Sequence, residues 1–419
     1  MKEKKYDALI VGGGSAGMAA ASEIAKAGYT VAIVEKESAL GGILNQCIHN
    51  GFGLQYFKEE LTGPEFAERF VNIVQDMPID IFTETTIMQV EDEEGFEKTV
   101  YGYSAKHGFL QFTTKSVVLA MGCRERNRGN IGTPGSRPSG VYTAGLAQRL
   151  VNMDGYIPGK EVVIVGSGDI GLIMARRMTW VGSNVKAVIE IQPNPAGLTR
   201  NIVQCLNDFN IPLYLSHVVS EIHGNQRVES VVVTPLENGI ADHENSFTID
   251  CDTVLLSVGL VPDNEVTKKF GAEISPVTNG AIVDSRLMTT VPGVFSCGNV
   301  LHVHDLVDYV TEESIRCGSC VVKYLQKDQP KQQFRTTPGP NVRYVVPNQY
   351  NPEEENKFFF RPLIVKNKAT VQVKLDGKVI KEKRVSHIQP SEMVELTLKP
   401  DLFEEMTSLQ DNKLEIGII

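Results

Sequence analysis

The first part of the chain follows an order of apolar and polar positions that predicts a strand, a turn, a helix and a second strand. Residues 6–11 are mostly apolar, which is typical of a buried strand. Glycine is frequent at 12–17, and residues 18–27 can continue as a helix. Residues 30–34 are apolar again, and this predicted strand ends at Glu35. The pattern is typical of a βαβ unit with glycines at its first turn.

The same order recurs in the middle of the chain. An apolar run at 161–165 leads into the glycines of 166–171 and a predicted helix that continues to Met178. A second apolar run at 185–189 ends at Glu190. Two such units in one chain predict two bound dinucleotides, one in each unit.

Each glycine of these turns has a mechanical role. The first allows the tight turn, the second lets a pyrophosphate approach the backbone, and the third lets the helix pack against the strand. The helix start offers N–H groups and a partial positive charge to the phosphates. The residues predicted to line the two turns are Gly12, Gly14, Ser15, Ala16, Gly17, Gly166, Gly168, Asp169, Ile170 and Gly171.

A carboxylate stands at the end of the second strand in both units. Glu35, followed by Lys36, and Glu190 are predicted to accept hydrogen bonds from ribose hydroxyls. A carboxylate at Glu190 favours a 2′-hydroxyl over a 2′-phosphate, which predicts NADH. Arg176 and Arg177 in the preceding helix are the residues that favour NADPH, the alternative.

The pattern changes after the second unit. Residues 326–341 are rich in Gln, Lys and Pro, which is typical of a linker. Apolar and polar residues then alternate around the turn signal Asp376-Gly377, which predicts a small antiparallel β domain over 342–419. This domain is either a docking surface for a partner subunit or a dimerisation or lid domain.

Composition narrows the class of protein. The 419 residues carry a formal net charge of -10, which argues against nucleic-acid binding. The apolar run near the start is too short for a signal peptide or a membrane span. The seven cysteines form no disulfide framework, so we expect reduced thiols and a cytoplasmic location.

Three further segments carry a resemblance to a known family. They are the strand-like run 117–122, the run 253–259 followed by Pro262, and the motif 292–299. With the two glycine turns, they resemble the FAD/NAD(P)-dependent pyridine-nucleotide oxidoreductases of the glutathione-reductase-like fold. The resemblance covers residues 6–326. Asn299 stands where that family usually has an Asp that bonds the ribityl chain of the flavin.

The resemblance implies an α/β fold with two Rossmann-like, three-layer ββα domains and the small C-terminal β domain. FAD would bind a discontinuous domain, 1–137 with 268–326, and NAD(P) would bind 138–267. The further cofactor contacts that it implies are Gly41, Gly42, Gly122, Gly259, Gly298 and Asn299.

Two segments resemble a subgroup of that family more closely. Residues 41–49 and 302–308 are similar to the FAD/NAD subunits of multicomponent dehydrogenases, whose partner subunit oxidises an amino acid, an amine or glycerol 3-phosphate. This likeness implies a homo- or hetero-oligomer with a partner dehydrogenase subunit or a small redox protein.

The catalytic candidates are fewer. Cys47 is either a redox thiol facing the flavin, with its pKa lowered by His49, or a small buried residue. His304, on the loop before a helix predicted from about residue 305 to 325, is a candidate proton donor at the flavin. The pair Cys317 and Cys320 is interpreted as structural, and no cysteine or histidine spacing predicts a metal site.

Three functions follow from these features. The first is hydride transfer between NADH and FAD in the electron-transfer subunit of a dehydrogenase complex. The second is a stand-alone NADH oxidase or peroxide-type reductase that uses Cys47. The third is a non-catalytic flavin-fold binding protein, which the intact second turn disfavours.

Overall fold

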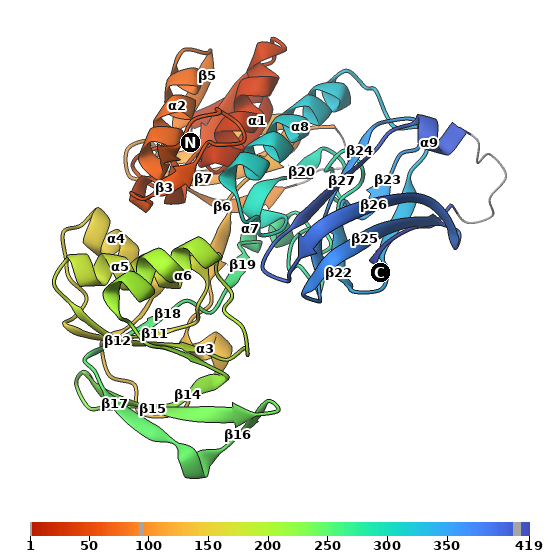
Figure 1. The fold of residues 1–419 in the computed structure, drawn as a ribbon. Coiled ribbons are helices and arrows are strands. Elements are labelled where there is room, and N and C mark those ends of the chain that lie inside the picture. Colours follow the sequence, from red (N-terminus) through yellow and green to blue (C-terminus); the bar gives the residue numbers. More distant parts are fainter. Residues whose placement is uncertain (1, 92–95, 405–411) are drawn as a thin grey trace. The chain divides into compact units, whose positions relative to one another are not determined.

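The computed structural model describes residues 2–91, 96–404 and 412–419, and it divides into two compact units (Figure 1). Unit 1 comprises Met1–Cys123 and Pro262–Ile419, and unit 2 comprises Arg124–Val261. The chain therefore leaves the first unit, builds the second and returns.

Unit 1 begins with a seven-stranded sheet in the order β5-β2-β1-β8-β7-β6, with β20 paired to β8. The strands β5, β2, β1, β8 and β20 run parallel, whereas β7 and β6 are antiparallel. Strand β1 is buried over Ala8–Ile10, as the continuous apolar run predicts. The strands are β1 (Lys2–Val11), β2 (Val31–Val34), β5 (Ile79–Phe82), β6 (Thr85–Glu91), β7 (Lys98–Ser104), β8 (Gly108–Leu119) and β20 (Val294–Ser296).

Helices pack side by side on this sheet (Figure 1). They are α1 (Ser15–Lys26), α2 (Gly63–Gln75) and α8 (Val307–Leu325). A Cβ at Gly318 of α8 would lie 2.7 Å from the carbonyl oxygen of Ala20, so glycine lets α8 pack closely on α1. Helix α8 begins at Val307, two residues later than expected from the sequence pattern.

Short elements connect the strands and helices of unit 1. They are η1 (Gly42–Gln46), β3 (Asn50–Phe52), β4 (Leu61–Thr62), β9 (Cys123–Glu125, which continues into unit 2), α7 (Glu265–Lys269) and η4 (Gly298–Val300). The turn η4 follows β20 directly. It therefore lies at the carboxyl edge of the parallel strands, the edge at which open α/β sheets bind ligands.

The C-terminal β region has its own apolar core within unit 1. Its two sheets have the orders β23-β21-β28-β25-β26 and β22-β24-β27. The strands are β21 (Phe334–Pro338), β22 (Val342–Val346), β23 (Gln349–Tyr350), β24 (Asn356–Pro362), β25 (Lys366–Leu375), β26 (Lys378–Ile388), β27 (Val394–Leu398) and β28 (Leu414–Ile418), with α9 (Asp401–Glu404) before the last.

Two details of this region differ from the sequence-based expectation, and one agrees. The first strand begins at Phe334, inside the expected linker. Strands β21 and β28 run parallel, so the region is mixed rather than purely antiparallel. The predicted hairpin at Asp376-Gly377 is confirmed, because Leu375 pairs with Lys378 and both turn residues have positive φ, 46° and 83°.

Unit 2 has three layers. Its parallel sheet, in the order β10-β18-β11-β12-β13, has helices on one face and an antiparallel sheet of β14, β15, β16 and β17 on the other (Figure 1). The strands are β10 (Val141–Thr143), β11 (Glu161–Val165), β12 (Asn184–Glu190), β13 (Leu213–Leu215), β14 (His217–Gly224), β15 (Val228–Glu237), β16 (Ile240–Ala241), β17 (Phe247–Asp250), β18 (Thr253–Leu256) and β19 (Leu260–Pro262, which ends in unit 1).

The helices of unit 2 are α3 (Arg128–Ile131), α4 (Ala144–Asn152), α5 (Asp169–Trp180) and α6 (Thr199–Cys205), with short turns η2 (Asn207–Phe209) and η3 (His243–Asn245). The predicted α/β class is confirmed by this architecture. Among the described residues, no helix combines the length and the apolar composition needed to cross a membrane.

The division between the units falls earlier than the expected boundaries at 138 and 267. The first boundary falls before 138 because the segment that precedes β10 packs within unit 2. Arg128 donates to the carbonyl oxygens of Thr133 and Pro134, and Ser136 donates its N–H to the carbonyl oxygen of Ile222 in β14 at 3.0 Å. This segment therefore belongs to the antiparallel layer of unit 2.

Candidate functional site

The first glycine turn joins β1 to α1 and leaves no room for side chains at two of its glycines. A Cβ at Gly12 would lie 2.5 Å from the carbonyl oxygen of Ala120, and a Cβ at Gly17 would overlap the carbonyl oxygen of Gly12. Any larger residue at these positions would have to displace backbone atoms. The turn can therefore be this tight only with glycine.

The middle glycine of this turn faces open space instead. A Cβ at Gly14 would meet no atom within 4 Å among the described residues, and Gly14 is the N-cap of α1. No described side chain caps this helix, so the N–H groups of Ser15 and Ala16 are available to an anion. This combination fits a diphosphate that approaches the backbone at Gly14.

A buried carboxylate closes the turn from the end of β2. Glu35 is only 6% exposed, and its Oε2 accepts the N–H of Gly13 at 2.7 Å. Its Oε1 accepts the N–H of Glu37 at 2.8 Å, while Lys36 between them is exposed. Glu35 therefore fixes the turn and stands where a ribose would follow the diphosphate.

Two distant segments converge on the first turn. The N–H of Gly41 donates to the carbonyl oxygen of Gly13 at 2.9 Å, and a Cβ at Gly42 would lie 3.2 Å from the Cα of Gly14. From the other side, a Cβ at Gly298 would lie 2.9 Å from the Cβ of Ala16. The structure thus brings the predicted residues 41, 42 and 298 to the turn.

Asn299 and Gly122 lie close to this convergence. Asn299 is half-buried, and its Oδ1 accepts the backbone N–H of His304 at 3.0 Å, which sets the orientation of the amide. Gly122 follows β8 and its carbonyl oxygen accepts the N–H of Asp263 at 3.0 Å. Gly122 thus lies where the chain leaves and re-enters unit 1.

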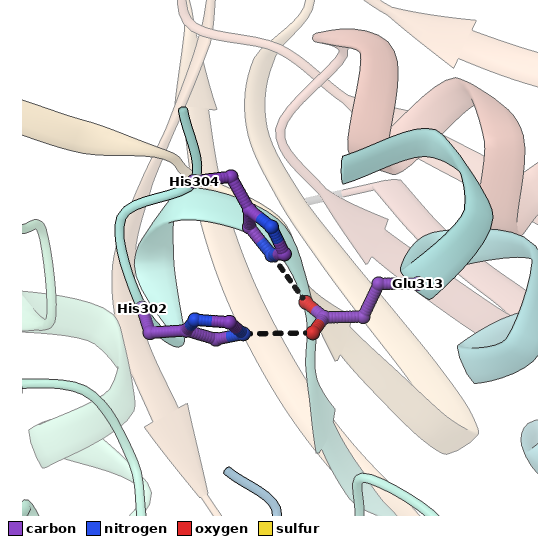
Figure 2. A group of neighbouring side chains, drawn as sticks. All are labelled: His302, His304 and Glu313. Atoms are coloured by element: carbon purple, nitrogen blue, oxygen red, sulfur yellow. Dashed lines mark hydrogen bonds and ion pairs between the residues drawn. The ribbon is translucent and has the colours of Figure 1, made fainter. Parts of the chain in front are cut away.

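Two histidines of the loop before α8 form a buried cluster with one carboxylate of α8 (Figure 2). Oε2 of Glu313 lies 2.8 Å from Nε2 of His302, and Oε1 lies 3.2 Å from Nε2 of His304. The same Oε1 accepts the N–H of Gly298 at 2.8 Å. All three side chains are enclosed, with exposures of 0–1%.

The cluster holds Glu313 as an anion. Burial by itself would raise the pKa of Glu313, but the two adjacent histidines outweigh it and hold this pKa well below the usual range. Burial, with His304 adding to it, lowers the pKa of His302 to about 4, so this ring is neutral near pH 7. The His302 ring therefore needs only its Nε2–H tautomer to bond Glu313.

The same three side chains have the spacing of a possible metal site, since their ligand atoms lie within 4.8 Å of one another. A histidine that binds a metal through Nε2 normally donates its Nδ1–H to a second acceptor. Within the described residues, neither His302 nor His304 has a partner for Nδ1. The surroundings thus favour the hydrogen-bonded cluster over a metal site.

This placement bears on the catalytic role expected for His304. Its side chain has no exposed surface, and the rings of His302 and Phe359 pack against it. A side chain that transferred a proton to a ligand would have to reach that ligand. The geometry instead favours a structural role in which His304 connects Glu313 to Asn299.

Sequence reasoning identified both histidines but missed Glu313. The signal was present, because Glu313 occupies the apolar face of α8 together with Val310 and Cys317. A carboxylate on such a face needs buried donors. Asp308 on the same helix is a parallel case, since it accepts the N–H groups of Gln55 and Tyr56 at 3.0 and 2.7 Å.

The cysteine candidates are enclosed. Cys47 is 5% exposed, its Sγ contacts the carbonyl oxygen of Ile43 at 3.3 Å, and burial raises its pKa to about 12. His49 is half-buried and its Nδ1 lies 3.0 Å from the carbonyl oxygen of Asn50. A thiol with a raised pKa is a poor nucleophile at neutral pH. Cys317 and Cys320 lie on the buried face of α8 and belong to the apolar core, in line with a structural role.

The second glycine turn repeats the plan of the first in unit 2. A Cβ at Gly166 would overlap the carbonyl oxygen of Ser257, and one at Gly171 would lie 2.6 Å from the carbonyl oxygen of Gly166. Gly168 is the N-cap of α5, with no capping side chain among the described residues, and a Cβ there would be 3.8 Å from the nearest atom. Again the outer glycines are enclosed and the middle one is open.

The residues after Gly168 start the helix. Asp169 is the first residue of α5, and its Oδ1 accepts the N–H of Leu198 at 2.9 Å and the amide of Asn201 at 2.7 Å. Ile170 is half-buried beside it, and Gly259 is exposed after β18. Asp169 therefore ties the start of α5 to the start of α6.

Glu190 closes the second turn as Glu35 closes the first. It is 4% exposed, and its Oε2 accepts both the N–H and the hydroxyl of Ser167, at 2.8 and 2.6 Å. The guanidinium of Arg176 lies over the ring of Trp180 at 4.8 Å, and Nε of Arg177 donates to Asn152 at 2.8 Å. Both arginines thus have other partners.

Comparisons with known proteins agree with this geometry. A family model described as pyridine nucleotide-disulphide oxidoreductase matches residues 6–316. An opine oxidase subunit of Agrobacterium tumefaciens (strain Ach5) is 26% identical over 325 residues, which are 70% of this chain and 61% of that protein. NADH oxidase of Methanocaldococcus jannaschii is 26% identical over 319 residues, 73% of this chain and 65% of that protein.

The chain thus spans less than two thirds of the length of either relative. Among solved structures, thioredoxin reductase of T. acidophilum has the same fold, with a TM-score of 0.64 and 24% identity over 76% of this chain and 98% of that one. Because the family model covers both glycine turns and the Gly298 motif, the chain belongs to the pyridine nucleotide-disulphide oxidoreductase family.

Proposed function

We propose that the protein binds FAD at the first glycine turn and NADH at the second, and that it transfers a hydride between them. Family membership implies FAD and a pyridine nucleotide as cofactors. One observation carries the proposal: each unit has a turn with two enclosed glycines, one open glycine and a buried carboxylate at the next strand end. Bound FAD supplies a ring that accepts or donates a hydride.

The residues of the first turn fit this cofactor. Gly14 leaves room for a diphosphate, the start of α1 offers N–H groups to it, and Glu35 can accept from a ribose hydroxyl. In unit 2, Gly168 and Glu190 do the same for the nicotinamide cofactor. Hydride transfer then requires that the nicotinamide of unit 2 reaches the flavin of unit 1.

Several residues support NADH over NADPH. Glu190 places a carboxylate at the strand end, and the next residue, Ile191, is 55% exposed and apolar. A 2′-phosphate would meet a negative charge there. Arg176 and Arg177, the residues that would favour NADPH, are held by Trp180 and Asn152.

We further propose that the protein is the electron-transfer subunit of a dehydrogenase complex, whose partner oxidises an amino acid, an amine or glycerol 3-phosphate. The similarity to a protein named as one subunit of an opine oxidase supports this role. The cysteines support it too: no disulfide links any of the seven, and six are buried while Cys123 is half-buried. An exposed dithiol, which a disulfide reductase would use, is lacking among the described residues.

Two measurements test this function. Purified protein supplied with FAD is expected to be yellow, and NADH is expected to bleach the flavin absorbance anaerobically. Amino acids, amines and glycerol 3-phosphate are expected to leave the flavin oxidised until the partner dehydrogenase is added. Turnover of such a substrate by the isolated chain would refute the subunit role, and a flavin that NADH does not reduce would favour the non-catalytic alternative.

A second candidate is a stand-alone NADH oxidase or peroxide-type reductase that uses Cys47, with His49 beside it. The similarity to an NADH oxidase of M. jannaschii favours it. The raised pKa of the buried Cys47 thiol opposes it. Cys47→Ser decides: loss of oxygen or peroxide turnover with an unchanged rate of flavin reduction would support Cys47, and unchanged turnover would exclude it.

A further inference from the structure

The turn η4 brings Gly298 and the side-chain amide of Asn299 to the first glycine turn. Gly298 packs against Ala16 in the first turn of α1, and Asn299 follows it at the carboxyl edge of the sheet. Gly298 has φ of +71°, a conformation that side-chain-bearing residues rarely adopt. Something must hold this short turn in place, since a three-residue 3₁₀ turn has little stability of its own.

Glu313 makes the contacts that hold it. Its Oε1 accepts the N–H of Gly298 at 2.8 Å across fifteen residues of chain. A fully buried carboxylate is costly unless its oxygens are satisfied, and here three N–H groups bond them. If Gly298 moved away, the buried carboxylate of Glu313 would lose one of its three donors, which opposes that movement.

A second path leads from Glu313 to Asn299. Nε2 of His304 bonds Glu313, and the backbone N–H of His304 bonds Oδ1 of Asn299 at 3.0 Å. Because Oδ1 is occupied, the amide Nδ2 of Asn299 points away from this contact, toward Sγ of Cys123 at 3.7 Å. The orientation of Asn299 therefore depends on the place of His304.

The C-terminal β region keeps the histidine loop against Glu313. The ring of Phe359 in β24 lies 5.6 Å from that of His302 and 5.1 Å from that of His304. Arg361 of the same strand donates to the carbonyl oxygen of Val303 at 3.2 Å. The cluster is thus enclosed by three elements of unit 1: η4, α8 and β24.

We propose that Glu313 is a positioning residue for FAD, because it holds Gly298 directly and Asn299 through His304 in the arrangement that meets the cofactor. The proposal rests on FAD binding at the first turn. Glu313 then acts on the cofactor site although its own buried side chain does not reach a ligand. The C-terminal β region takes part in the same site, because Phe359 packs on both histidines.

The test measures FAD affinity in three variants of the full-length chain. Glu313→Ala removes all three acceptor contacts and is expected to raise the FAD dissociation constant about tenfold or more. Glu313→Gln keeps an oxygen for Gly298 but loses the charge and one acceptor, so it is expected to raise the dissociation constant only a few-fold. Ser314→Ala is the matched control, because Ser314 is also buried on α8 but donates only to Val310 of its own helix.

The measurements are titration of the apoprotein by flavin fluorescence and the visible spectrum of the bound flavin, with circular dichroism to confirm folding. Folded Glu313→Ala that binds FAD within twofold of Ser314→Ala overturns the proposal. Should Glu313→Ala fail to fold, Glu313→Gln decides. A dissociation constant raised a few-fold with a shifted flavin band supports the role, and identical binding and spectrum overturn it. Wild-type protein that binds no FAD would instead refute the proposed function.

Discussion

The two glycine turns share one backbone plan and differ in what surrounds it. In unit 1, Glu35 holds the turn through the N–H of Gly13, and the segments of Gly41 and Gly298 pack against it. In unit 2, Glu190 binds both the N–H and the hydroxyl of Ser167. Distant segments therefore reach both turns: the segments of Gly41 and Gly298 pack on the first, whereas the backbone N–H groups of Ala196 and Leu198 bond Ser167 and Asp169 of the second.

This difference bears on how each cofactor is held. A turn enclosed by several segments restrains a ligand on more sides, which suits a cofactor that stays bound through turnover. The second turn is met by fewer distant segments, chiefly that of Ala196 and Leu198, which leaves its ligand freer to exchange, as a nicotinamide cofactor must. The comparison thus predicts tight binding of FAD in unit 1 and exchange of NADH in unit 2.

The largest effects are expected from the enclosed third glycines. Gly17→Ala forces a methyl group into the carbonyl oxygen of Gly12, so FAD affinity should fall about 100-fold with a loss of stability of about 3 kcal/mol. Gly171→Ala should leave the protein yellow but slow its reduction by NADH. Flavin content and stopped-flow reduction measure the two outcomes, and a colourless Gly171→Ala would contradict the separation of the two sites.

The open middle glycines should affect binding without affecting folding. A methyl group at Gly14 or Gly168 meets only free space or a contact of 3.8 Å, so thermal stability should change little. It would stand where a diphosphate approaches, and we expect about a tenfold weaker FAD for Gly14→Ala and a tenfold higher KM for NADH for Gly168→Ala. Each variant is the control for the other, since only one cofactor should respond in each.

Replacing the strand-end carboxylates by amides should have smaller effects on cofactor binding. The effect at Glu35 should be on FAD affinity, and the effect at Glu190 on the choice between NADH and NADPH. Glu35→Gln should weaken FAD several-fold, because one ribose acceptor and its charge are lost. Glu190→Gln should lower the ratio of kcat/KM for NADH to that for NADPH by about tenfold, because a 2′-phosphate no longer meets an anion. Ratios of kcat/KM for the two nucleotides measure this, and an unchanged ratio would remove Glu190 from cofactor selection.

The smallest effect is expected at Ser167. Its hydroxyl donates to Glu190 and accepts the N–H of Ala196 at 2.9 Å. Ser167→Ala removes the hydroxyl that the first turn, with Gly13 at this position, also lacks. The free energy of unfolding should fall by about 1 kcal/mol. Urea denaturation measures it. A KM for NADH that stays within twofold is expected, and a large rise would mean that Ser167 binds the cofactor directly.

Much of the local structure could be predicted from the chain itself. Residues 6–35 and 161–190 carry the strand, turn and helix signals within 30 residues, and Asp376-Gly377 specifies a hairpin by its own φ preferences. The unit boundary could not be placed in this way. It depends on Arg128 and Ser136, whose partners include Ile222 of a distant strand.

The roles of Cys47 and His304 illustrate the same limit. Their residue types suggest redox and proton-transfer chemistry, yet burial decides whether a thiol ionises or an imidazole reaches a ligand. Burial is a property of packing between segments. Nearby residues in the sequence could therefore suggest a redox role for Cys47 and a proton-transfer role for His304, but they could not show whether either side chain is accessible.

The amino-acid sequence alone determined the two glycine turns, because glycine sterics, helix starts and strand-end carboxylates act over a few neighbouring residues. Only the tertiary structure decided that Glu313 joins Gly298, His302 and His304. These groups lie within residues 298–313 and meet because η4, the histidine loop and α8 pack against one another and against β24. The free energy of that packing, and not a preference of any one segment, brings the buried charge to its donors.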